Sequence, residues 1–185
     1  MSLLVIGFAS ANAQVELKGL VGMNFSTFHG TDASVSAKAG VQYGAGVLIG
    51  DKFYVEPGIQ FVRNSAVITP AGTSEEIEFS QNLVKIPVYA GYHVIGAEDK
   101  PIALRLFAGP SLSIPGTIKK GENHISKDDV NNSIWSVDGG VGLDILFLFV
   151  EASYEYSFND YFVESFTDNG KHGAFIINAG IHIDF

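Results

Sequence analysis

The chain contains no cysteine among its 185 residues, so disulfide bonds, thiol catalysis and zinc–thiolate sites are excluded. Positive charge is scarce, with 11 Lys and Arg against 20 Asp and Glu and a formal net charge of -9. We expect no nucleic-acid partner, because phosphates attract basic surfaces. The chain also lacks an apolar run of about 18 residues, which excludes a membrane-spanning helix.

Apolar residues are nevertheless abundant, at 46% of the chain, and they alternate with polar residues. The clearest case is the stretch 173–185. From Phe175 onward every odd position is apolar, whereas Asn178, His182 and Asp184 occupy even positions. A two-residue period places one set of side chains on each face of a β-strand. This stretch therefore predicts a strand with one apolar and one polar face.

The same alternation recurs along the chain and predicts about eight strands, joined in turn by long and short connections. Short turns are expected near 50–52, 94–101 and 146–147, and long loops elsewhere, with the longest at 114–132. Long outer loops and short periplasmic turns are typical of up-and-down membrane barrels. The expected strands are residues 15–27, 38–49, 53–62, 77–93, 102–113, 133–145, 148–158 and 173–185.

The charged residues of these strands lie on the face opposite the apolar one, with Arg63 and Glu78 near strand ends as exceptions. A soluble barrel would bury the apolar face instead. Three features favour lipid outside: aromatic residues near strand ends, many glycines on the polar face, and strands long enough to cross the hydrocarbon layer. We therefore predict an all-β fold, an eight-stranded antiparallel up-and-down transmembrane β-barrel, in the outer membrane.

The amino-terminal residues are expected to lie outside this domain. An apolar segment at 3–9 precedes Ala11-Asn12-Ala13, a small-x-small pattern like that of a signal-peptide cleavage site. A basic segment ahead of the apolar core is missing. We predict a signal peptide at 1–13, cleavage after Ala13, and a barrel domain at 14–185; the alternative is a short first strand or buried helix.

Three prolines oppose a closed barrel. Pro57, Pro87 and Pro110 fall within expected strands, and each removes a ladder hydrogen bond. Either β-bulges lie beside them or the sheet is mixed and partly open.

The segments 55–61 (VEPGIQF), 83–88 (LVKIPV) and 108–111 (AGPS) carry these prolines, and they resemble strand motifs of the PorT-like outer-membrane β-barrel family. The resemblance covers essentially the whole chain after residue 13. It implies an eight-stranded outer-membrane barrel that tolerates prolines at these positions. Some members are linked to protein secretion, so the resemblance leaves the function open.

An eight-stranded barrel is narrow enough for its own side chains to fill it. We predict that the inward-facing charges form a hydrogen-bonded structural plug, because an unpaired buried charge is costly. The acidic surplus suggests trapped water or a cation, and the alternative is a proton or ion path. The predicted plug residues are Glu56, Lys85, Arg105, Asp138, Asp144, Glu151 and Glu155.

Histidines raise the possibility of other chemistry. His29, His124 and His172 fall in three expected outer loops, where solvated histidines are more common than metal ligands. His124-Ile125-Ser126 resembles the His-x-Ser of lipid A deacylases, but it lies in an expected loop without an apolar groove for an acyl chain. We therefore expect no catalytic residues, cofactor or metal.

The leading hypothesis is a non-enzymatic outer-membrane barrel acting through its outer loops in adhesion, surface recognition or docking with envelope or secretion components. Its expected partners are outer-membrane lipid and other envelope proteins. Two alternatives stay open: a soluble lipocalin-like barrel that binds a small apolar ligand, and a lipid A-modifying enzyme using Ser126.

Overall fold

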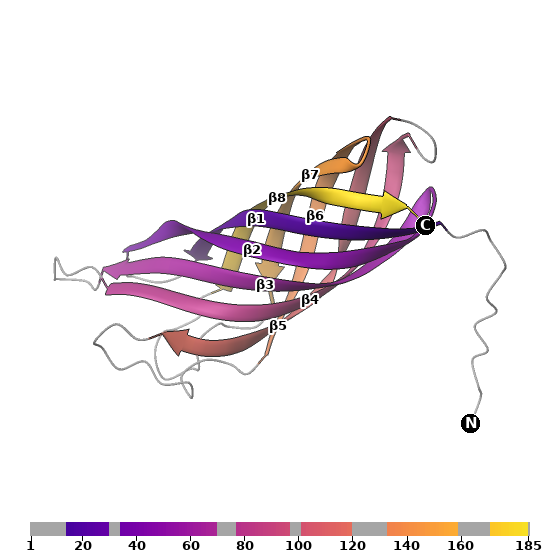
Figure 1. The fold of residues 1–185 in the computed structure, drawn as a ribbon. Helices are drawn as coiled ribbons and strands as arrows, with labels where there is room; N and C mark the ends of the chain where they lie inside the picture. Colours follow the sequence, from indigo (N-terminus) through magenta and orange to yellow (C-terminus); the bar gives the residue numbers. More distant parts are fainter. Residues whose placement is uncertain are drawn as a thin grey trace, which may run out of the picture.

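The computed structural model describes residues 14–29, 34–69, 77–96, 101–119, 133–158 and 171–184. Within these ranges no helix is long and apolar enough to cross a membrane. The chain instead forms eight strands (Figure 1). They are β1 (Val15–His29), β2 (Ser34–Gly50), β3 (Phe53–Thr69), β4 (Ile77–Ile95), β5 (Ile102–Lys119), β6 (Ile134–Ile145), β7 (Leu148–Ser157) and β8 (Lys171–Asp184).

Each strand pairs antiparallel with the next, and β1 pairs with β8, so the sheet closes into a barrel in simple meander order. This confirms the predicted eight-stranded up-and-down barrel. A closed sheet satisfies every strand edge, which a lipid environment demands because it offers no water to unpaired backbone groups. The first strand begins and the last strand ends at the same end of the barrel (Figure 1).

That end also carries the short connections between β2 and β3, β4 and β5, and β6 and β7. We call it the turn end, and the opposite end the far end. The β6–β7 reversal has only Leu146 and Phe147 between the strands, and Leu146 adopts a left-handed φ of 56°. Backbone bonds hold this turn to its neighbours, since Leu146 N donates to the Pro101 carbonyl and Phe147 O accepts from His182 N, both at 2.9 Å.

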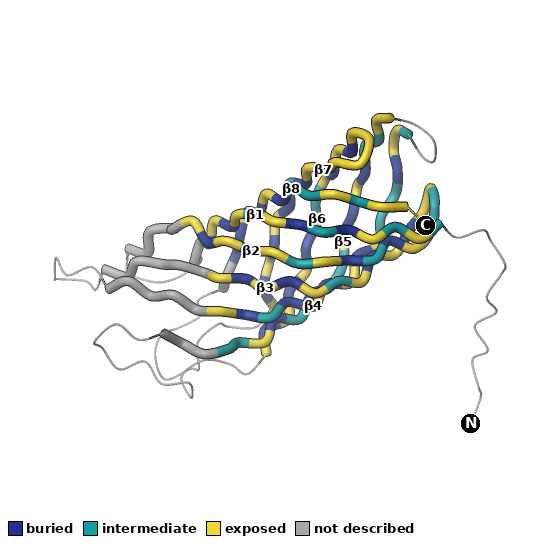
Figure 2. Tube along the Cα trace, in the orientation of Figure 1, coloured by how far each residue is buried: buried dark blue, intermediate teal, exposed yellow. Residues whose placement is uncertain are grey.

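Burial alternates residue by residue along the strands (Figure 2). In β6 every odd-numbered residue from Trp135 to Ile145 is exposed, including Val141, while Ser136 and Asp138 are buried. The exposed face is therefore apolar, and the polar face lines the interior. This is opposite to the arrangement that a soluble, lipocalin-like barrel requires.

Two glycines show how the narrow interior accommodates aromatic rings. A Cβ at Gly91 would lie 2.0 Å from Cζ of Tyr54, and one at Gly180 would lie 2.7 Å from Cζ of Phe149. Both rings therefore occupy space that any other residue would fill with its own Cβ. Glycine on the polar face is a packing requirement here, as small barrels demand.

Several strands extend further at the far end than the alternation predicts. β2 begins at Ser34 rather than 38, β3 continues to Thr69, and β5 continues to Lys119, inside the expected longest loop. The added parts of β2 and β3 pair with each other from Ser34 and Thr69 to Lys38 and Ser65. A ladder of backbone hydrogen bonds needs no apolar face, so strands continue past the point where the apolar alternation fades. The expected signal peptide at 1–13 lies outside the described residues.

The prolines lie in a closed sheet, and the expected bulges beside them are absent. In the β3–β4 ladder, pairing stops at Pro57 and Val88 and resumes at Gln60 and Lys85 without a change of register. The β4–β5 ladder likewise keeps its register between the Pro87 pair and the Ala90 pair. The prolines therefore interrupt local pairing only. The register shifts lie elsewhere: one between residues 38 and 41 in the β2–β3 ladder, and two in the β4–β5 ladder, between residues 81 and 83 and between residues 93 and 95.

Candidate functional site

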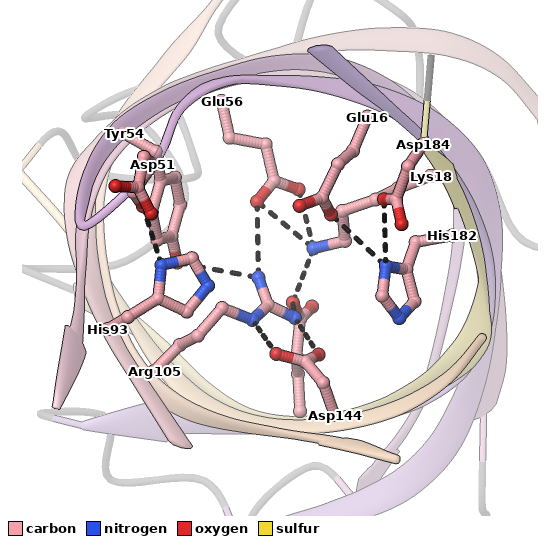
Figure 3. A network of polar contacts seen from close by, with 11 residues as sticks. Glu16, Lys18, Asp51, Tyr54, Glu56, His93, Arg105, Asp144, His182 and Asp184 are labelled. Atoms are coloured by element: carbon pink, nitrogen blue, oxygen red, sulfur yellow. Dashed lines mark hydrogen bonds and ion pairs between the residues drawn. The ribbon is translucent and has the colours of Figure 1, made fainter. Parts of the chain in front are cut away.

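Inward-facing residues near the turn-end termini of their strands form a cluster of ion pairs, which we call the turn-end cluster. Figure 3 shows how its side chains meet inside the barrel. The Lys18 ammonium donates to Glu56 at 2.8 Å and to Glu151 at 2.5 Å. The Arg105 guanidinium donates two hydrogen bonds to Asp144, from Nε to Oδ2 at 2.6 Å and from Nη2 to Oδ1 at 2.7 Å. Arg105 Nη2 also donates to Glu151 at 3.0 Å. Glu151 thus links both cations, and the five side chains form one network.

Strand geometry explains why these five meet. Lys18 is on β1, Glu56 on β3, Arg105 on β5, Asp144 on β6 and Glu151 on β7, so they come from strands around the whole barrel. All five are buried. In an interior just wide enough for side chains, inward-facing groups from opposite walls touch across the lumen. The two-residue period points each of them inward.

A second group, the far cluster, lies further from the turn end. Lys85 donates to Asp138 Oδ1 at 2.8 Å and to Glu155. The Tyr89 hydroxyl donates to the other oxygen of Asp138 at 3.3 Å. The far cluster therefore contains one ammonium group and two buried carboxylates, whereas the turn-end cluster contains two cations and three carboxylates.

Large apolar rings lie between and beside the clusters. Leu48, Tyr54, Tyr89 and Phe107 form one buried apolar group. Tyr54 accepts a hydrogen bond of 3.4 Å from Arg105 Nη1, so this group touches the turn-end cluster, and Tyr89 connects it to the far cluster. The Phe149 ring also packs against the turn-end cluster, with the Lys18 ammonium 4.5 Å from its ring centroid. The rings exclude water from the charges and so strengthen their attraction.

All seven predicted plug residues have buried side chains facing the interior, but they do not form one group. Glu56, Arg105, Asp144 and Glu151 belong to the turn-end cluster, and Lys85, Asp138 and Glu155 to the far cluster. Their role as a plug remains a prediction.

Sequence reasoning missed Lys18, which is 1% exposed and links Glu56 to Glu151. The signal was present, because Lys18 shares its strand face with Glu16 and Asn24. It also missed the two histidines of the turn end. His93 Nδ1 lies 2.7 Å from the Asp51 carbonyl, and His182 Nδ1 lies 3.1 Å from Glu16 Oε2 (Figure 3).

The histidines weighed from sequence lie elsewhere. His29 ends β1 and His172 belongs to β8, so neither is in a loop as expected. His124 and Ser126 lie outside the described residues.

In each cluster the cations lie in direct contact with the carboxylates, which outnumber them by one. Desolvating an ion costs several kcal/mol, so removing one partner of a buried pair costs about 3–5 kcal/mol. The bidentate Arg105–Asp144 pair adds geometric specificity to that attraction. Each cluster thereby joins strands that are not neighbours in the sheet.

Comparisons with known proteins agree with this architecture. A family model described as an outer membrane protein beta-barrel domain matches residues 8–163. The curated proteins give no match. The crystal structure of the outer membrane protein OprG from Pseudomonas aeruginosa aligns with a TM-score of 0.56 at 11% identity, covering 94% of this chain and 96% of that chain.

The crystal structure of Neisserial surface protein A aligns with a TM-score of 0.52 at 13% identity, covering 90% of this chain and 96% of that one. At such identities these two structures show the shared fold. The family match spans most of the chain and fits the closed barrel with its apolar outer face. The chain belongs to the family of outer membrane protein beta-barrel domains, and its place is the outer membrane.

Proposed function

We propose that the chain is a non-enzymatic barrel whose wall and plug form a rigid scaffold, and that its activity resides in the far-end connections. The observation that carries this proposal is the filled interior, in which two ion-pair clusters flank a layer of aromatic rings. A lumen packed in this way is unsuited to general diffusion. Any binding function would then lie at one of the two ends of the barrel.

The far end is the better candidate of the two. Its connections are residues 30–33, 70–76, 120–132 and 159–170, whereas two of the three turn-end connections have only two residues between strands. Long connections are the outer ones in membrane barrels, and binding functions concentrate on loops held by a rigid scaffold.

The far-end extensions of β2 to β5 support the same proposal. Pairing continues to Ser34 and Thr69 between β2 and β3, and to Ser80 and Lys119 between β4 and β5. This side of the wall extends further than β6 and β7 (Figure 1). It presents the connections 30–33, 70–76 and 120–132 on an ordered platform, suited to adhesion, surface recognition or docking of another envelope protein.

We further propose that the chain is of the PorT-like kind within this family. The motifs at 55–61, 83–88 and 108–111 support it, because the structure places them side by side on β3, β4 and β5. Docking with a secretion component is then the favoured form of the function. His124 and Ser126, the residues considered for a lipid A enzyme, lie outside the described ranges.

The first experiment tests the closed scaffold. The mature chain, refolded into detergent, is inserted into planar lipid bilayers and its conductance recorded, with an open porin as positive control. We expect a heat-dependent mobility shift on a denaturing gel and no steady conductance. A stable open channel of reproducible conductance would overturn the scaffold proposal.

The second experiment tests the far-end connections. Residues 120–132 are replaced by a short Gly-Ser linker, and 70–76 separately, and cells displaying each variant are tested for attachment to immobilised host matrix and for crosslinking to neighbouring envelope proteins. We expect folding to survive, as judged by the gel shift, and attachment or crosslinking to be lost in at least one variant. The same replacement is then made at 30–33 and at 159–170, and if all four variants leave both readouts unchanged, the far-end connections do not carry the activity.

A further inference from the structure

Three potential metal ligands converge at the seam where the barrel closes. Glu16 is on β1, and His182 and Asp184 are on β8. The two strands pair so that Glu16 lies opposite Asp184 and Lys18 opposite His182. Residues directly opposite each other on one face of an antiparallel pair have Cβ atoms about 5 Å apart. The register of the closing pair therefore brings all three side chains together inside the turn end (Figure 3).

The distances match a coordination site. Nδ1 of His182 lies 3.1 Å from Glu16 Oε2 and 3.8 Å from Asp184 Oδ1. One ligand atom from each residue lies within 4.8 Å of the other two. Donor atoms around a tetrahedral zinc ion lie about 3.4 Å apart, because each zinc–ligand bond is about 2.1 Å. The ligand atoms of the three residues therefore lie at or within about 1.5 Å of the spacing that a zinc ion requires.

The charge of the surroundings gives an independent reason for a cation. The neighbouring turn-end cluster already has three carboxylates for two cations. Glu16 and Asp184 add two more carboxylates at the same end of the lumen. Asp184 is largely exposed, but Glu16 and the carboxylates of the turn-end cluster are shielded from solvent, where uncompensated negative charge is costly. A bound divalent ion would reduce this surplus from three negative charges to one.

The exposure of the three side chains suggests how an ion would enter. Glu16 and His182 are 15% and 14% exposed, whereas Asp184 is 58% exposed. Asp184 thus faces the turn-end opening, and the other two lie deeper. An ion from solution would first contact the exposed carboxylate of Asp184 and would then be held by the more buried pair.

We propose that Glu16, His182 and Asp184 form a binding site for a divalent transition-metal ion of the zinc class, which ties β1 to β8. One imidazole and two carboxylates suit such ions better than Mg²⁺ or Ca²⁺, which prefer oxygen ligands only. Three protein ligands leave a fourth position for water. Bound metal stabilises the seam, since an ion that binds only the closed barrel shifts the folding equilibrium towards it. The site is independent of the far-end connections.

The test uses the refolded full-length barrel in detergent, freed of metal with a chelator, and Zn²⁺ alone as the probe. Binding is measured by isothermal titration calorimetry, and thermal stability is followed with and without Zn²⁺. We expect one high-affinity equivalent of Zn²⁺ and a melting temperature that rises with its concentration. Mg²⁺ at the same concentration should reproduce neither effect.

Two variants assign the site, and a third is the matched control. His182→Gln and Asp184→Asn should weaken Zn²⁺ binding by more than about 100-fold, because losing a group that merely orients a ligand already costs about 10–100-fold. His93→Gln should bind normally, because His93 lies at the same end but contacts the Asp51 carbonyl. A heat-dependent gel shift verifies the folding of each variant, and Asp184→Asn alters a side chain that is mostly exposed.

The proposal is overturned if the wild-type barrel binds no Zn²⁺ at millimolar concentration. It is equally overturned if His182→Gln and Asp184→Asn bind Zn²⁺ as tightly as the wild type, which would place the metal on other histidines. In the first case a protonated His182 paired with Glu16 would account for the geometry.

Discussion

Lys85 and Ile86 are neighbours in β4, yet Lys85 is 2% exposed and Ile86 is 40% exposed. The wall of this barrel separates two environments, the surrounding lipid and the polar interior, and successive side chains of each strand point into one and then the other. The outer face offers apolar side chains to lipid and carries almost no charge, whereas the inner face holds charges that must find partners among themselves. The same substitution should therefore have opposite consequences on the two faces.

Removing a buried cation should have the largest effect. Lys85→Met deletes the ammonium that contacts both Asp138 and Glu155. We expect the free energy of unfolding to fall by about 3–5 kcal/mol, the usual cost of breaking a buried pair from one side. Urea unfolding in lipid vesicles, followed by the fluorescence of the single tryptophan, measures it. The control Ile86→Met should change stability by less than about 1.5 kcal/mol; equal effects would contradict the comparison.

Adding a charge outside should cost nearly as much. Val141 is 46% exposed and lies in the middle of β6, on the outer face. Val141→Lys should destabilise the barrel in vesicles by about 2–4 kcal/mol, the usual cost of Lys at the bilayer midplane. Val141→Leu should be nearly neutral. If Val141→Lys left the free energy of unfolding unchanged, this face would not contact hydrocarbon.

Adding a methyl group to a glycine should likewise lower the stability of the barrel only on the inner face. Gly91→Ala would place a Cβ 2.0 Å from the Tyr54 ring, whereas the nearest atom to a Cβ at the exposed Gly139 is 4.0 Å away. We expect Gly91→Ala to cost about 1–3 kcal/mol through overpacking. Gly139→Ala should cost nothing measurable in the same unfolding assay. If both are tolerated, Tyr54 has room to move and the interior is looser than described.

The smallest effect should come from a change that keeps the charge. Arg105→Lys retains a cation but loses the paired bonds to Asp144. We expect a loss of about 1–2 kcal/mol, because a lysine cannot reproduce the planar fork. Lys52→Arg on the exposed β2–β3 turn is the control and should be neutral. A loss as large as that of Lys85→Met would indicate that geometry matters more than charge in the turn-end cluster.

Much of this architecture was predictable from local pattern. The existence of the strands follows from a two-residue period, and the meander order and the tight turn at Leu146 and Phe147 follow from the short and long connections. The inward direction of the seven predicted charges follows from the aromatic residues near strand ends, the glycines of the polar face and the strand lengths. Strand ends were less predictable. β5 continues to Lys119 through hydrogen bonds with β4, and such bonds leave no trace in apolar alternation.

The pairing of the charges could not be predicted. Lys18 and Glu56 are 38 residues apart and Lys85 and Asp138 are 53 apart, and nothing local links them. Which groups meet depends on the stagger of neighbouring strands and on how the sheet closes. The division into two clusters and the seam ligands Glu16, His182 and Asp184 both result from that closure.

The sequence by itself thus determined which face of each strand is apolar, because side chains alternate by the geometry of an extended backbone. Only the tertiary structure decided the partners across the lumen, the continuous register past the three prolines, and the meeting of β1 with β8. These depend on closure, which is a property of all eight strands together and of no single segment.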